Sequence, residues 1–256
     1  EVKNESSPKL LYHDLFTNRI GYVQVGFNTE SVSLEEIQYL PLLGKLVLEM
    51  GSRRHDYVKL MQKMGIHTGG IRASHFSSLT LEDRDRILSY IFFNGKTTLD
   101  KVEELFDLYV EFLTEYEFNN PRRLVEILRS EKADMESSLV PSGNHYISLR
   151  LQSYGSCIGR YDELTGGIAY FKFLRNLLES AEKKPDEIAN RFRSVAEKIL
   201  TRNNLLVNIT SEASDYKRFE KRVNDLFERF PDQSLERANL SFEEPVKNEA
   251  FPTASA

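Results

Sequence analysis

The chain has 256 residues, of which 40% are hydrophobic and 29% are charged, so one large core or two small ones, and hence one or two domains, are expected. Basic and acidic residues are mixed along the whole chain and give a net charge of -5, which excludes a general attraction to nucleic acid or to anionic membrane surfaces. The single cysteine excludes an internal disulfide, and no run of about 18 apolar residues predicts a transmembrane helix.

The first fifty residues predict two strands followed by a helix. Aromatic and β-branched residues within positions 10 to 28 favour two strands joined near residue 18. Ser33 stands three residues before Glu36, which is the spacing of a capping box, and apolar residues at helical spacing follow as far as Gly51. Glycine is expected to end that helix, and Pro41 to kink it or to begin its second half.

The next forty residues predict a helix and at least one strand. Asp56 can cap a short helix that Gly65 closes. The segment HTGGIRASHF, residues 67 to 76, is predicted to be a strand because two adjacent glycines disfavour a helix. Residues 86 to 95 are compatible with either a helix or a strand.

Helices dominate the rest of the chain, with one strand among them. Apolar stripes predict helices that begin near Thr98, Asn120 and Gly167. Two more helices are predicted at residues 188 to 199 and 216 to 230. Between these two, residues 203 to 210 are predicted to form a short buried strand. The helix after Asn120 should break around Pro141 and Gly143. The expected fold is therefore α+β, with a mostly antiparallel sheet and long helices layered on one face.

The C-terminal segment lacks a helical pattern. Residues 231–256 are polar and contain three prolines, so they are expected to be a linker towards a missing next domain, and residues 1–230 form the domain. The chain also begins without methionine, at EVKNESSPK, as expected for a piece excised from a longer polypeptide.

None of the chemical motifs in the chain is complete. FFNGKTTLDK ends like a phosphate-binding loop, but Tyr90 stands where the first glycine is required, and a strand end with a turn at Gly95 is the simpler interpretation. His67 and His75 are eight residues apart on one predicted strand, too far apart to share a metal ion. We therefore expect no catalytic residue, no bound metal and no cofactor in this chain.

Several stretches, in order, resemble one peptidase family. LFTNRIGYVQVGF, LPLLGKLVLEMG, HTGGIRAS, PSGNHYISLRLQSYGS, TGGIAYFKFL and NNLLVNIT are similar to the presequence protease branch of the pitrilysin and insulinase zinc metallopeptidases. The match is to the domain that opens their C-terminal half. In the catalytic repeat of this family, a helix carries His-x-x-Glu-His, and aligning the glycine that ends the helix places Leu42, Lys45 and Leu46 at those three positions.

The resemblance implies a role without catalysis. The chain is expected to form part of the chamber wall of a larger zinc metalloendopeptidase that degrades short unfolded peptides, with zinc in the N-terminal half and sibling domains as partners. By analogy with the substrate-pairing strand of the catalytic repeat, the candidate peptide contacts are Thr68, Gly69, Gly70, Ile71, Arg72, Ala73 and Ser74. The alternatives are a structural or assembly domain like the inactive processing-peptidase subunits, and an independent peptide-binding module. The location implied is cytoplasmic if the protein is bacterial, and an organelle matrix if it is eukaryotic.

Overall fold

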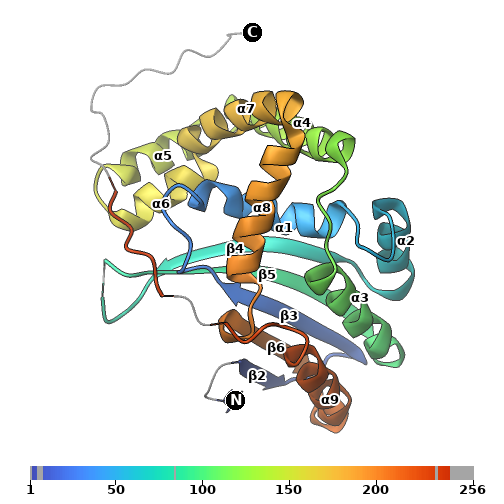
Figure 1. The fold of residues 1–256 in the computed structure, drawn as a ribbon. Helices are drawn as coiled ribbons and strands as arrows, with labels where there is room; N and C mark the ends of the chain where they lie inside the picture. Colours follow the sequence, from blue (N-terminus) through green and yellow to red (C-terminus); the bar gives the residue numbers. More distant parts are fainter. Residues whose placement is uncertain (1, 5–7, 84, 234–235, 243–256) are drawn as a thin grey trace.

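A six-stranded sheet forms the base of the molecule (Figure 1). The computed structural model describes residues 2–4, 8–83, 85–233 and 236–242. The strands are β1 (Val2–Asn4), β2 (Lys9–Asp14), β3 (Ile20–Asn28), β4 (Ile71–Leu79), β5 (Ile87–Thr98) and β6 (Leu205–Ser211), in the order β1-β2-β6-β3-β5-β4. β2 and β6 are parallel, whereas the other neighbouring strands are antiparallel. This arrangement confirms the expected α+β fold with a mostly antiparallel sheet.

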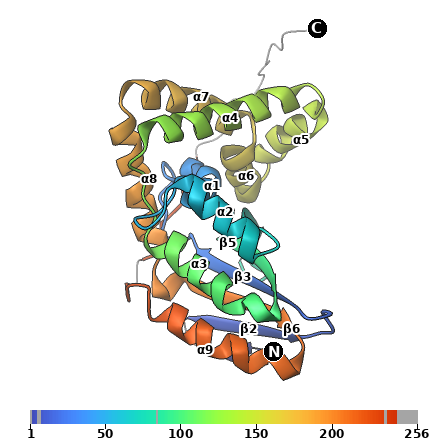
Figure 2. The ribbon, with the colours of Figure 1, turned by 90° about the vertical axis from the view of Figure 1, so that its right-hand side faces the viewer.

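The helices form two groups above one face of the sheet (Figures 1 and 2). Helices α1 (Leu40–Glu49), α2 (Tyr57–His67), α3 (Val102–Thr114) and α9 (Tyr216–Phe227) lie near the sheet, and α6 (Cys157–Gly166) also packs against β4. The others are α4 (Pro121–Leu139), α5 (Gly143–Ser153), α7 (Ile168–Lys183) and α8 (Pro185–Ile199). Among these, α4, α5 and α7 lie farther from the sheet than α1 does. None of the described helices has both the length and the hydropathy needed to cross a bilayer.

One hydrophobic core begins between the sheet and the nearer helices and continues among α4, α7 and α8, where Leu128, Leu174 and Phe192 are fully buried. Side chains alternate along each central strand, and those facing the helices are buried, as Val25, Phe93 and Val207 illustrate. α1 approaches the sheet closely at Gly44, where an added Cβ would come within 2.7 Å of the Cβ of Ala73 on β4. The close contact therefore requires glycine at position 44 and a small residue opposite it.

Most of the predicted helix ends are confirmed. Pro41 lies in the first turn of α1, after a short 3-10 helix at Ile37–Tyr39, so it begins the second half of the predicted helix. Gly51 follows α1 with a φ of 100°, which glycine adopts at little cost. Asp56 and Asn120 cap α2 and α4 by accepting hydrogen bonds from backbone N–H groups of the first turn.

The predicted boundary between α2 and the next strand is wrong. α2 continues past Gly65 to His67, and it ends where the backbone N–H and the hydroxyl of Thr68 both donate to the carbonyl of Met64. Gly70 then turns the chain with a φ of 99°. Strand β4 therefore begins at Ile71, four residues later than predicted, so His67 and His75 do not share a strand.

The predicted turn at Gly95 is also wrong, because β5 runs on to Thr98. A Cβ at Gly95 would lie 2.6 Å from the hydroxyl oxygen of Tyr109 on α3, so the glycine makes room for this helix. Residues 86 to 95, which the sequence left ambiguous, belong mainly to β5. Helix α6 was not predicted as a separate element, although Ser156, which accepts a hydrogen bond from the backbone N–H of Gly159, caps it.

The division at residue 231 stays a prediction. Within the described part of the C-terminal segment, the backbone N–H of Ala238 donates to the carbonyl of Glu30 at 2.8 Å, and Leu240 and Phe242 pack against the core. Residues 243–256 lie outside the described part of the chain.

Candidate functional site

In α1, leucines stand at the two positions that the resemblance aligns with histidine ligands, and Lys45 stands at the position aligned with the glutamate. The side chains of Leu42 and Leu46 are fully buried in the core. Lys45 points away from them, and its Nζ lies 2.9 Å from Oε2 of Glu131 on α4. Partial burial alone would lower the pKa of Lys45, but the hydrogen bond and the charge of Glu131 outweigh it and raise the pKa above its ordinary value.

These three side chains do not fit a zinc ion. Zinc needs three or four nitrogen, oxygen or sulfur donors, whereas leucine has no lone pair and a protonated lysine repels the cation. Among the described residues, no group of three or more histidine, cysteine, aspartate or glutamate side chains is placed to hold a metal. We derive no metal chemistry from this chain.

The seven candidate peptide contacts fall into two structural classes. Thr68, Gly69 and Gly70 form the turn after α2, and the backbone N–H of Gly69 donates to the carbonyl of Lys96 at 2.7 Å. The other four, residues 71–74, begin strand β4, which lies at the edge of the sheet. An edge strand presents backbone N–H and C=O groups that can pair with an added strand. The described part of the chain supplies no strand on the outer side of β4.

The two faces of β4 differ. Ile71 and Ala73 are partly buried and pack against the core, whereas Arg72 and Ser74 are exposed on the opposite side of the sheet. An added strand at this edge would therefore meet exposed polar side chains on one face and α1 and α6 near the other.

A buried polar network holds the middle of β4 against α6. Nε2 of His75 lies 3.0 Å from the Tyr161 hydroxyl and 3.2 Å from Ser89 Oγ, and the Ser89 and Tyr161 hydroxyls are 2.6 Å apart. Burial lowers the pKa of His75 to about 4 and raises that of Tyr161 to about 12, so both are neutral near pH 7. Next to them, Ser77 Oγ donates to Asp162 at 2.7 Å.

A second network joins the turn after α1 to α3. Ser52 Oγ donates to Oε1 of Glu111 at 2.6 Å, and Nδ1 of His55 lies 2.6 Å from the same oxygen. Burial would raise the pKa of Glu111, but the hydrogen bonds from Ser52 and His55 outweigh it and lower the pKa. Ser52 and His55 both bond to the Glu111 carboxylate, and the serine hydroxyl does not donate to the histidine ring. These three side chains therefore do not form a nucleophile activated by a base.

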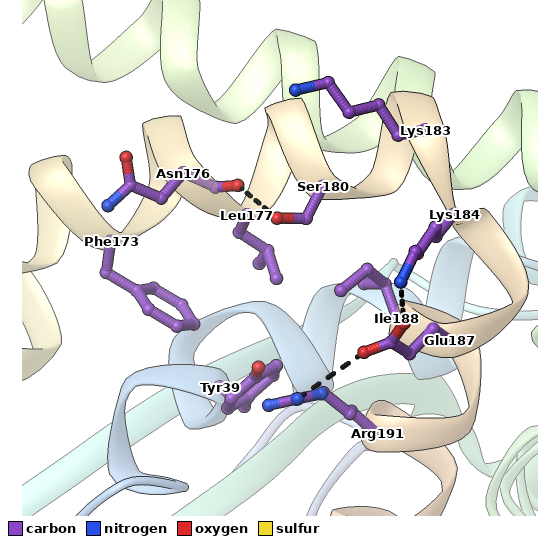
Figure 3. Close-up of a pocket in the computed structure, with 10 residues that line it drawn as sticks. All are labelled: Tyr39, Phe173, Asn176, Leu177, Ser180, Lys183, Lys184, Glu187, Ile188 and Arg191. Atoms are coloured by element: carbon purple, nitrogen blue, oxygen red, sulfur yellow. Dashed lines mark hydrogen bonds and ion pairs between the residues drawn. The ribbon is translucent and has the colours of Figure 1, made fainter.

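The cleft between α7 and α8 has a volume of about 360 Å³ (Figure 3). The rings of Tyr39 and Phe173 meet edge to face at its wall, with centroids 5.0 Å apart. Glu187 lies 3.3 Å from Lys184 Nζ and 3.6 Å from Arg191 Nη2, so the cleft neutralises these two cations itself. The described residues that line it include no nucleophile paired with a base.

The partners of these side chains were not predicted from the sequence. Glu131 is 86 positions from Lys45, and Tyr161 is 86 positions from His75. No periodic signal links such distant positions in a single sequence. In contrast, the alternation of polar and apolar residues along β3, as at Val23, Gln24 and Val25, could have indicated a sheet with one open face.

The sequence of this chain is similar to one family model and to parts of longer proteins. The family model for the domain associated with subfamily C of the M16 peptidases matches residues 1–177. The protein HypA of Clostridium perfringens is 28% identical over 253 residues, which is 99% of this chain and 26% of that protein. Presequence protease 1, chloroplastic/mitochondrial, of Arabidopsis thaliana is 30% identical over 252 residues, 98% of this chain and 23% of that protein. The chain thus spans about a quarter of the length of these relatives.

Two solved structures share the fold. The peptidase M16 inactive domain from Pseudomonas fluorescens superposes with a TM-score of 0.59 at 15% identity, covering 96% of this chain and 54% of that one. Pitrilysin superposes with a TM-score of 0.60 at 14% identity, covering 94% of this chain and 24% of that one. At these identities the similarity establishes the fold.

Proposed function

Because the chain belongs to the family of domains associated with subfamily C of the M16 peptidases, we propose that it is a non-catalytic domain of a larger zinc metalloendopeptidase. In this role it forms part of the wall of a chamber in which short unfolded peptides, such as targeting presequences, are degraded. Zinc and the cleavage chemistry belong to the N-terminal half of the parent enzyme, and the partners of this domain are sibling domains of the same polypeptide. Membership of the family confirms the resemblance found in the sequence.

One observation carries the proposal. The positions that align with His-x-x-Glu-His hold Leu42, Lys45 and Leu46, and the two leucines are fully buried. The helix therefore contributes to stability where a sister repeat uses it for catalysis.

We propose that β4 and the turn before it contact the peptide. The strand is at the sheet edge, and Arg72 and Ser74 are exposed there. An extended peptide can add to such an edge through main-chain hydrogen bonds. We propose that the parent enzyme is cytoplasmic if it is bacterial and lies in an organelle matrix if it is eukaryotic. The Arabidopsis relative is named as chloroplastic and mitochondrial, which supports an organelle for a eukaryotic parent.

Cross-linking in the full-length polypeptide tests this proposal. A photoreactive group is placed at Ser74, or at Lys217 on the exposed face of α9 as the matched control, and a labelled peptide is added to enzyme whose catalytic glutamate has been replaced by glutamine. We expect peptide cross-links from Ser74 and none from Lys217. Equal labelling, or labelling from Lys217 alone, would favour an assembly domain that does not contact substrate.

A further inference from the structure

The sheet face away from the helices carries side chains from β2 to β4 and, among the described residues, no acidic one. Its members are Lys9, Leu11, His13, Tyr22, Gln24, Gly26, Asn28, Arg72, Ser74, Phe76, Ser78, Leu88, Tyr90, Phe92, Asn94, Lys96, Leu206, Asn208 and Thr210. We call this set the open face. Every member except Gly26 is exposed or half-buried, whereas their neighbours along the strands, such as Val25 and Phe93, are buried.

Three cations of the open face lack an ion-pair partner within the described ranges. Lys9, Arg72 and Lys96 are exposed, and no described acidic side chain forms an ion pair with any of them. Of the acids at the ends of these strands, Asp14 accepts a hydrogen bond from a backbone N–H. Glu30 accepts one from Asn28 of the open face at 3.3 Å, and its charge is paired with Arg86 and Arg237. In a chain with net charge -5, this face is therefore locally positive.

A row of side-chain amides crosses the centre of the open face. Asn208 donates to Gln24 at 2.7 Å, Gln24 donates to Asn94 at 2.7 Å, and Asn94 donates to Ser74 at 2.9 Å. The row spans strands β6, β3, β5 and β4, and Arg72 lies beside Asn94 at its end. Each bond fixes the next amide, and Gln24 and Asn208 each keep one side-chain N–H that no described residue accepts.

An aromatic platform lies one row away from the amides. The rings of Tyr90 and Phe92 are stacked with centroids 5.4 Å apart, and Phe76 meets Phe92 edge to face at 6.4 Å. Gly26 allows this arrangement, because a Cβ there would lie 2.4 Å from the Phe92 ring. Phe76 keeps 45% of its surface exposed, so the platform is open to a ligand.

We infer that the open face binds an extended polypeptide segment that carries both carboxylates and apolar side chains. The three exposed cations and the spare amide donors match carboxylates, and the aromatic platform matches apolar side chains. This inference rests on the proposed function, and adds to it that peptides with acidic residues bind at this face. Targeting presequences are basic and poor in acidic residues, so their contact is assigned to the edge of β4 and not to this face. The inference concerns the face of the sheet, whereas the proposed contact at the edge of β4 involves the backbone.

The inference is tested with the 256-residue chain and three labelled synthetic peptides of equal length. They share the same phenylalanine and leucine positions and carry several glutamates, glutamines or lysines at the others. We expect fluorescence anisotropy at low salt to show the glutamate peptide binding about tenfold more tightly than the glutamine peptide, with the difference shrinking in high salt. The lysine peptide should bind least.

Substitutions on the open face measure separately how charge and hydrophobic contact contribute to peptide affinity. The double variant Arg72→Gln, Lys96→Gln should lose about tenfold in affinity for the glutamate peptide and keep its affinity for the glutamine peptide. The matched control is Lys59→Gln, Lys217→Gln, which removes two exposed cations from the helical side and should change neither affinity. Phe76→Ala should weaken both peptides.

Several outcomes would overturn the inference. These are binding of none of the peptides, equal affinity for all three, equal loss in the two double variants, and tighter binding of a single-stranded RNA oligonucleotide than of the glutamate peptide. Equal affinity would leave the proposed function standing, because the domain would still contact peptide without selecting its charge. If no peptide binds, the chamber role is still decided by the cross-linking of the full-length polypeptide.

Discussion

Leu42 and Leu46 lie one helical turn apart, and their exposure is zero. At these positions a histidine would bury a polar imidazole in the apolar core, and its flat ring does not fit the space of the branched leucine side chain. We therefore expect Leu42→His and Leu46→His each to lower the free energy of unfolding by about 3 kcal/mol or more, measured by urea denaturation.

Lys45→His on the same helix is the matched control. The ion pair with Glu131 is about one-third exposed on each side, so its loss should cost less than about 1 kcal/mol. If the two leucine variants were as stable as the lysine variant, the account of this helix as a packing element would be contradicted.

His75 makes stability depend on pH. Its pKa is about 4 in the folded protein and 6.5 when unfolded, because burial disfavours the charged ring. The unfolded state therefore binds more protons between these values, and stability falls as the pH drops from about 6.5 towards 4, by at most about 3 kcal/mol. Burial raises the pKa of Asp162, which contributes with the opposite sign, so a variant is needed to isolate the histidine.

Urea unfolding from about pH 7 to about pH 5 measures this effect. His75→Phe should flatten the fall in stability, whatever its cost at neutral pH. A slope that is the same in the wild type and in His75→Phe would show that His75 is not responsible.

At the scale of elements, replacing each of two helical glycines by alanine should change the stability of the fold in opposite directions. A Cβ at Gly44 would lie 2.7 Å from the Ala73 Cβ, and neither atom can rotate away, so Gly44→Ala should push α1 from β4 and cost about 1–3 kcal/mol. Gly65 on α2 has no atom within 4 Å of its added Cβ, so Gly65→Ala should stabilise by about 0.5–1 kcal/mol. Thermal unfolding compares the two variants, and a stabilising Gly44→Ala would refute the close contact.

Elements with local signals were predictable from the sequence. Asp56, Asn120 and Gly51 act on their immediate neighbours, and each marks a helix end as expected. Gly65 and Gly95 were misinterpreted as a helix end and a turn. Gly65 is tolerated within an exposed helix, and Gly95 is explained by Tyr109, which approaches from another element.

Only the part of the candidate site on α1 was predictable, because it follows from aligning a short stretch of sequence with the family motif. The resemblance in sequence predicts that Leu42 and Leu46 replace the two histidines of the metal motif and that Lys45 replaces its glutamate. The edge position of β4 cannot, because it depends on β5 pairing on one side and on no described strand lying on the other. The amide row likewise joins residues as far apart as Gln24 and Asn208 through the order of strands in the sheet.

At the scale of the whole molecule, the chain combines a family-typical fold with a helix that cannot hold zinc. The chain covers 26% and 23% of two of its relatives, and our proposal is that catalysis lies elsewhere in the parent enzyme while this domain forms chamber wall and contacts peptide.

The most direct test of this account is the zinc content of the 256-residue chain and of the full-length polypeptide, purified identically and measured by mass spectrometry together with cleavage of a fluorogenic peptide. The account predicts stoichiometric zinc and chelator-sensitive cleavage in the full-length polypeptide, and neither in the chain. Stoichiometric zinc in the chain, with cleavage that a chelator abolishes, would contradict it.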